Sequence, residues 1–165
     1  MWHRRYVLVV AVVLVTGMSG TGKSVTLAEL ARRGHRVVDT DYGGWIEDVD
    51  SEPLWREDRI ATLLDEHTDG ALFIAGCVAN QGKFYPRFDA VVLLSAPEDV
   101  ILERVSTRDT NDFGKSEPER ARIVGDLASV EPLLRRGATA ELDTRAPLEA
   151  VADELERIAR CAPSD

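Results

Sequence analysis

The sequence has few of the residues that mark several common protein classes. Only two of its 165 residues are cysteines, Cys77 and Cys161, and they lie far apart and outside any metal-ligand spacing. The three histidines also form no motif. A disulfide framework and a cysteine-based zinc site are therefore excluded, and we expect the protein to be cytoplasmic, with its thiols reduced.

Positive charge is also scarce. Lysine and arginine number 20 against 29 aspartates and glutamates, which gives a net charge of −9. A protein that binds nucleic acid or an anionic membrane surface needs a basic stripe. We therefore expect neither partner.

Long apolar runs are missing as well. The longest run, residues 6–15, follows Arg4 and Arg5 and imitates the start of a secretory signal. It is shorter than the roughly 20 residues of a membrane-spanning helix, and it leads into a glycine-rich loop without a clean small-residue cleavage site. We interpret it as a buried parallel strand, which is typically a continuous run of Val, Ile and Leu.

The most informative motif follows that strand. Residues 17–24 read Gly-Met-Ser-Gly-Thr-Gly-Lys-Ser, the full G-x-x-x-x-G-K-[ST] phosphate loop, between a strand and a helical pattern. Its glycines let successive backbone N–H groups point at phosphate oxygens, and the following helix adds its positive N-terminal end. The motif predicts nucleotide contacts from Gly17, Met18, Ser19, Gly20, Thr21, Gly22, Lys23, Ser24 and Val25. Lys23 would reach the outer phosphates, and the Ser24 hydroxyl would be a ligand of Mg²⁺.

The rest of the chain alternates between strand and helix patterns, and its length suits a single domain, 1–165. Strands are expected over residues 8–16, 35–39, 71–76, 90–95 and 139–143. Helices are expected over residues 23–33, 53–67, 97–107, 117–136 and 147–161, with a short one within 80–88. Helical crossovers between five short strands indicate a parallel sheet covered on both faces, with ligands at the carboxyl ends of the strands.

Two aspartates, Asp39 and Asp41, leave the second strand. Both carboxylates can face the ligand edge, where one can hold Mg²⁺ and the other can orient or deprotonate a substrate hydroxyl. An aspartate-rich turn is the alternative, but the neighbouring phosphate loop favours function.

Two arginines, Arg104 and Arg108, lie four residues apart at a helix end, before a polar loop that contains Gly114. Their planar side chains suit phosphate. The loop, about 107–116, is a candidate lid that closes over phosphates and excludes water. Solvent-exposed arginines are the alternative.

Candidates for binding the second substrate are less specific. Arg56 and Arg59, within a region of about 42–68, could grip an anionic group, whereas Gly76, Asn80 and Arg87 at and after the third strand could line an acceptor pocket. An ordinary solvated helix face and loop explain these polar residues about as well. Cys77 is expected to be a structural thiol.

Taken together, these residues resemble the small P-loop kinases of the nucleoside-monophosphate, shikimate and gluconate kinase group. Asp39-Thr40-Asp41 looks like the shikimate kinase Asp-x-Asp, in which the first carboxylate serves Mg²⁺ and the second contacts the acceptor hydroxyl. Arg104 and Arg108 resemble the lid arginines of adenylate kinases. Pro132-Leu133-Leu134 and Asp143-Thr144 echo the end of shikimate kinases, where the next loop lies against adenine, which implies nucleotide contacts from Arg145 and Pro147.

The departures from this pattern concern the acceptor. Val130 stands where shikimate kinases carry an arginine for the acceptor carboxylate, and Gly76-Cys77-Val78 replaces their triple glycine. No aspartate ends the third strand. The Ala75–Ala79 stretch leans toward the gluconate kinase pattern, and shikimate itself is not the expected acceptor.

The resemblance implies an α/β, three-layer P-loop NTPase fold, whose five-stranded parallel sheet has the order 2-3-1-4-5 and helices on both faces. It implies transfer of the γ-phosphoryl of MgATP to a small hydroxyl acceptor, with Lys23, Asp41 and Arg108 catalytic and with Ser24 and Asp39 at the metal. A nucleoside-monophosphate kinase and a nucleotide-dependent switch or ATPase remain alternatives. The expected partners are a nucleotide and a small acceptor, in a monomer or homodimer.

Overall fold

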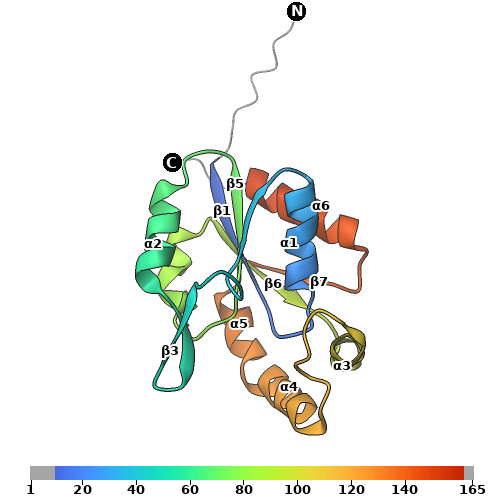
Figure 1. Ribbon diagram of the computed structural model, residues 1–165. Coiled ribbons are helices and arrows are strands. Elements are labelled where there is room, and N and C mark those ends of the chain that lie inside the picture. The colour runs from blue at the N-terminus through green and yellow to red at the C-terminus, as the bar shows by residue number, and fades with distance from the viewer. Residues whose placement is uncertain (1–9, 162–165) are drawn as a thin grey trace, which may run out of the picture.

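The computed structural model describes residues 10–161, and its centre is a five-stranded parallel sheet (Figure 1). The strands are β1 (Ala11–Thr16), β2 (Arg36–Asp39), β5 (Ala71–Ala75), β6 (Ala90–Ser95) and β7 (Ala140–Asp143). They lie in the order β2-β5-β1-β6-β7, and every pairing is parallel. The expected sheet is confirmed. Numbering its five strands alone gives 2-3-1-4-5, and the labels differ because two further strands intervene in the chain.

Helices cover both faces of this sheet. They are α1 (Lys23–Arg32), α2 (Glu57–Glu66), α3 (Glu98–Thr107), α4 (Glu117–Ser129), α5 (Glu131–Gly137), α6 (Leu148–Arg160) and the 3-10 helix η1 (Gln81–Arg87). Figure 1 shows α1 and α6 on one face and α2 on the other, with α3, α4 and α5 near the end where β1 terminates. None of the helices in residues 10–161 has the length and apolarity that crossing a bilayer requires.

The apolar first strand is buried because it lies at the centre of the three layers. Val13 and Val15 pack with α1 and α6, whereas Val12 and Leu14 pack with α2, Trp55 and η1. Every residue of β1 is buried. A strand covered on both faces carries no polar alternation, which explains the continuous run. Residues 1–9, including the first part of the expected strand 8–16, lie outside the described residues.

Three loops meet at the carboxyl edge of the sheet. Val15 is in register with Ala75, and Ala75 is in register with Asp39 on the other side. The phosphate loop after β1, the aspartate turn after β2 and the Gly76–Val78 segment after β5 therefore leave adjacent strands at the same level. This register positions the candidate site.

The segment after the aspartates differs from expectation. Instead of a helix that begins at Pro53, the chain forms an antiparallel hairpin, β3 (Ile46–Val49) and β4 (Glu52–Trp55), and α2 starts only at Glu57. The turn residues Asp50 and Ser51 both have positive φ, 53° and 66°, as a two-residue hairpin turn of type I′ requires. The expected helix start is wrong because Trp55, only 1% exposed, joins the core through β4.

The expected helix over 117–136 is two helices. The first, α4, begins with a capping box formed by Ser116 and Glu119 and ends at Ser129. The second, α5, carries Pro132 in its first turn. Proline has no N–H for an i−4 hydrogen bond and its ring obstructs the preceding turn, so a continuous helix breaks there.

Candidate active site

A cleft of about 730 Å³ opens at the carboxyl edge of the sheet. Its lining combines the phosphate loop, the first turns of α1, the turn after β2, the segment after β5 and the start of the expected lid. The lining residues are Gly17, Met18, Ser19, Gly20, Gly22, Lys23, Ser24, Val25, Ala28, Asp41, Tyr42, Cys77, Arg104, Thr107, Arg108, Thr110 and Asn111.

The phosphate loop has the tight curvature that its glycines permit. A Cβ on Gly17 would lie 2.5 Å from the carbonyl oxygen of Leu94, and a Cβ on Gly20 would lie 2.8 Å from a methyl carbon of Val105. Gly20 also has a φ of 84°, in the left-handed region. Because β6 lies so close to Gly17 and α3 so close to Gly20, neither position has room for a side chain. The loop therefore forms a cradle lined by backbone groups, which fits a polyphosphate.

Lys23 lies at the bottom of this cradle. Its ammonium group donates hydrogen bonds to the carbonyl oxygens of Gly17 and of Met18, the latter at 3.0 Å. Burial lowers the pKa of Lys23, and the carboxylates of Asp41 and Asp39 oppose that shift. The Lys23 ammonium is therefore held within the phosphate loop.

The two aspartates have different environments. The Ser24 hydroxyl donates a 2.7 Å hydrogen bond to Asp39, and the other Asp39 oxygen accepts one from the backbone N–H of Asp41. Asp41 lines the cleft. The Asp41 side chain contacts solvent, but the surrounding protein removes part of its hydration. This desolvation raises the pKa of Asp41; Lys23 opposes the rise, and Asp39 adds to it.

The donor set beside the loop fits Mg²⁺. Ser24 and Asp39 offer adjacent hard oxygens, and the described residues contain no group of three or more His, Cys, Asp or Glu side chains that could hold a metal alone. An ion here would complete its shell with water and phosphate oxygens, as Mg²⁺ usually does. Ser24 and Asp39 are thus close enough to act as the expected metal pair.

Arg104 of α3 and Arg108, which directly follows that helix, both reach the phosphate loop. Arg104 donates to the carbonyl oxygen of Gly20 at 3.3 Å and, more tightly, to Thr144 after β7. Arg108 donates to the Ser19 hydroxyl at 3.4 Å and to backbone oxygens of the expected lid, including Phe113 at 2.7 Å. The lid segment therefore lies against the loop through Arg108.

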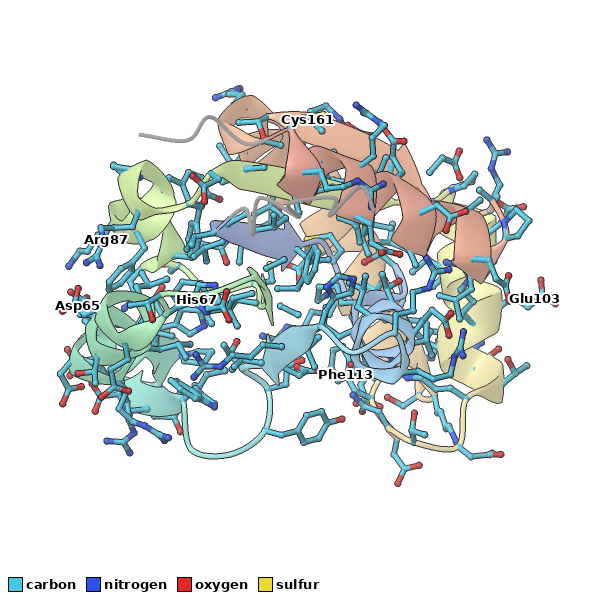
Figure 2. The ribbon with its side chains drawn as sticks, turned by 90° about the horizontal axis from the view of Figure 1, so that it is seen from above. Asp65, His67, Arg87, Glu103, Phe113 and Cys161 are labelled. Atoms are coloured by element: carbon cyan, nitrogen blue, oxygen red, sulfur yellow. The ribbon has the colours of Figure 1, made fainter. Side chains whose placement is uncertain are left out.

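Most residues expected to bind the acceptor lie elsewhere. Arg56 pairs with Glu47 on the hairpin, and Arg59 stacks over the Trp45 ring at 4.2 Å and donates to the carbonyls of residues 43 and 44. Figure 2 shows Arg87 beside Asp65 at the rim of the molecule, on the side opposite Glu103 of α3. None of the three arginines lines the cleft.

The two remaining acceptor candidates have structural contacts. Asn80 is 8% exposed, and its amide group bonds both the backbone N–H and the C=O of Trp55. A Cβ on Gly76 would lie 2.5 Å from the Thr40 hydroxyl and 2.9 Å from the Trp55 ring. The expectation that they line the pocket is corrected: both residues seat the buried tryptophan of β4.

The loop after β7 meets the cleft lining at Arg104. Arg145 pairs with Asp143 two residues earlier at 2.7 Å, and this ion pair holds the pKa of Asp143 at about 2. Neither Arg145 nor Pro147 lines the cleft, whereas Thr144 anchors Arg104. Within the loop that the resemblance to shikimate kinases places against adenine, Thr144 is thus the residue that contacts the cleft lining, through Arg104.

Two residues of the cleft lining were not named as site residues from the sequence, although Tyr42 begins the region of about 42–68 expected to bind the acceptor. Tyr42, 59% exposed, directly follows Asp41, so its place beyond a strand end was a usable signal. Cys77, expected to be structural, borders the cleft, and burial raises the pKa of its thiol. Buried Gln81 supports this wall by donating to Thr16 and Tyr85 while accepting from the backbone N–H of Val78.

Comparison with known proteins gives the family. The family model described as an AAA domain matches residues 13–125, which include the phosphate loop, both aspartates and the lid segment. The chain belongs to this AAA domain family. Over 48 residues it is 48% identical to the HPr kinase/phosphorylase of Clostridium beijerinckii, and over 104 residues it is 32% identical to the uncharacterized protein YqaC of Bacillus subtilis. These matches cover 29% and 61% of the chain, and it spans 16% and 57% of the lengths of those relatives.

Solved structures show the same fold at low sequence identity. Shikimate kinase from Acinetobacter baumannii, in complex with shikimate, superimposes with a TM-score of 0.66 at 20% identity, covering 90% of this chain and 92% of that one. A gluconokinase from Sinorhizobium meliloti 1021 gives a TM-score of 0.60 at 20% identity, covering 94% and 95%. The resemblance to small P-loop kinases is confirmed at the level of the fold.

Proposed function

We propose that the protein is an ATP-dependent kinase that transfers the γ-phosphoryl group of MgATP to a hydroxyl of a small acceptor. The observation that carries this proposal is the presence of two different carboxylates beside the phosphate loop. Asp39 is bonded to Ser24, whereas Asp41 lines the cleft and has no side-chain partner among the hydrogen bonds of the described residues. A nucleotide switch needs the first carboxylate; a hydroxyl kinase needs both.

Bound MgATP would supply the phosphoryl group and the charge of the metal. The backbone of residues 17–24 and Lys23 would hold the phosphates, and Ser24 with Asp39 would orient the metal. Lys23 and Arg108 would neutralise negative charge on the transferred group, which is the main contribution that proteins make to phosphoryl transfer.

Asp41 would act on the acceptor. Its carboxylate would accept a hydrogen bond from the acceptor hydroxyl and take the proton as the new O–P bond forms and the bond between Pγ and the leaving oxygen of ADP breaks. Its raised pKa, caused by burial, moves it toward the working pH of a general base.

A coupled ADP-release assay tests the proposal. Purified protein with MgATP would be offered sugars, polyols, nucleosides and nucleotides, alongside Lys23→Ala and Asp41→Asn variants. We expect ADP release that depends on one hydroxyl acceptor, is absent in Lys23→Ala and falls by roughly 10²-fold or more in Asp41→Asn.

Two results would support the other functions. Acceptor-independent ADP release that Asp41→Asn leaves intact would indicate an ATPase switch. Turnover of a nucleoside monophosphate at an unchanged rate in Asp41→Asn would indicate a nucleoside-monophosphate kinase, because a phosphate acceptor needs no base. A nucleoside-monophosphate kinase requires cations that bind the acceptor phosphate. Arg56, Arg59 and Arg87 all lie outside the cleft lining, which favours the hydroxyl kinase.

A further inference from the structure

Charge is divided unevenly along the cleft. Its lining contains three cationic side chains, those of Lys23, Arg104 and Arg108. Each contacts the phosphate loop: Lys23 through two carbonyls, Arg104 through the carbonyl of Gly20 and Arg108 through the hydroxyl of Ser19. The positive charge therefore lies on the side that would hold a triphosphate.

The part of the lining that follows β2 has a negative character. Asp41 belongs to it, and the Asp39 carboxylate, which is bonded to Ser24, accepts a hydrogen bond from the Asp41 backbone. Burial raises the pKa of the neighbouring Cys77 thiol; Lys23 opposes that rise, whereas Asp41 and the Asp126 carboxylate of α4 add to it. Asp41, the Tyr42 ring and the Cys77 thiol together form what we call the acceptor wall of the cleft. When phosphates neutralise Lys23 and the metal neutralises Asp39, Asp41 is the carboxylate that remains in the described lining.

Four cations near the hairpin and in the lid have other partners. Arg56 pairs with Glu47, Lys83 pairs with Glu57, and the guanidinium of Arg59 contacts two backbone carbonyls and the Trp45 ring. Lys115 of the lid pairs with Asp112. To bind an anion at the acceptor end, the protein would have to break one of these contacts and move the side chain into the cleft.

We infer that the acceptor is a hydroxyl compound without an anionic group, such as a free sugar, a sugar alcohol or a nucleoside. This inference rests on the proposed kinase function and adds the class of its substrate. Apart from the three cations that contact the phosphate loop, the described cleft lining offers no cation to an acceptor carboxylate or phosphate. It offers the Asp41 carboxylate instead, and a like-charge contact of this kind is a strong barrier to the wrong partner. A neutral polyol can instead donate hydrogen bonds to the same carboxylate.

Matched acceptors that differ in charge test the inference. Glucitol would be compared with gluconate, adenosine with adenosine monophosphate, and methyl shikimate with shikimate, in the ADP-release assay at saturating MgATP. We expect the neutral member of the productive pair to have a kcat/KM at least about tenfold higher. An anionic member that is equal or better would overturn the inference while leaving the kinase proposal intact.

A second measurement needs no turnover. Iodoacetamide and iodoacetate differ in charge but share a leaving group, and Cys77 lies in the acceptor wall whereas Cys161 is exposed at the end of α6. With MgADP bound, mass spectrometry would give the ratio of amide to acetate labelling at each thiol. We expect a severalfold higher ratio at Cys77 than at Cys161, and a smaller excess in Asp41→Asn. Equal ratios at the two cysteines would refute the negative acceptor wall whether or not any acceptor is phosphorylated.

Discussion

Asn80 provides a sharp test of structural against substrate-binding roles. Its side-chain oxygen accepts from the Trp55 N–H at 2.9 Å, and its amide nitrogen donates to the Trp55 C=O at 3.0 Å and to Glu57 at 3.1 Å. Trp55 is 1% exposed, so an Asn80→Ala substitution would leave two backbone polar groups without partners at a buried residue.

The expected cost follows from those two groups. A buried donor or acceptor left unpaired costs about 1–3 kcal/mol, and taking the lower half of that range for each gives about 2–4 kcal/mol for Asn80→Ala. In a domain of this size 1 kcal/mol corresponds to about 2–4 °C in Tm, so the midpoint should fall by about 4–16 °C.

Thermal unfolding followed by circular dichroism measures this shift, and Arg87→Ala is the matched control. Arg87 forms an exposed pair with Asp65, a contact that contributes about 0–1 kcal/mol. The reasoning is refuted if Asn80→Ala keeps the wild-type Tm and instead raises the KM of the acceptor, because Asn80 would then belong to the substrate site.

Three further predictions concern the cleft. Lys23→Ala should reduce phosphoryl transfer by about 10³-fold or more with an unchanged Tm, measured by turnover and thermal unfolding together; activity within about tenfold of wild type would contradict the catalytic role. Residues 107–116 should exchange amide hydrogens more slowly with an ATP analogue bound, because Arg108 links this segment to the phosphate loop, and equal exchange in both states would remove the lid. Because burial raises the pKa of Asp41, turnover should fall as pH drops through a value above that of an ordinary aspartate, and a pH profile of Asp41→Asn that keeps this acid limb would exclude Asp41 as the base.

The parts of the fold that the sequence predicted well are those governed by local pattern. A continuous Val and Leu run marked β1, and the Gly-Lys-Ser motif located the loop and the start of α1, because both follow from contacts within a few residues. Register then brings Asp39 and Asp41 to the phosphate loop, as parallel pairing of β2 with β5 and of β5 with β1 requires. For these residues, local pattern and sheet topology together were sufficient.

The hairpin and the acceptor side could not be predicted in the same way. Pro53 suits a helix start, but it pairs with Asp48 across the hairpin, and the decisive contact is burial of Trp55 among α2, η1 and Thr40. The contacts of the arginines also depend on residues distant in the sequence. Arg59 lies over the Trp45 ring, and Arg87 pairs with Asp65, 22 residues away in sequence. Charge and spacing show that an arginine is available; only the packed fold shows which partner it meets.

The phosphate loop and the segment around Tyr42 differ in how well they tolerate substitution. On the phosphate side, Gly17 and Gly20 lie against the backbone of β6 and the side chains of α3, so a larger residue would have to displace the core. On the acceptor side, Tyr42 lies on a connection from β2 to an inserted hairpin, and it is largely exposed. Substitution of Tyr42 changes the wall of the cleft without opening a cavity in either core layer. Substitutions on this side can therefore change what the cleft binds while the phosphate loop stays intact, and under the proposed kinase function the acceptor is best sought by varying the charge of the compounds offered to Asp41.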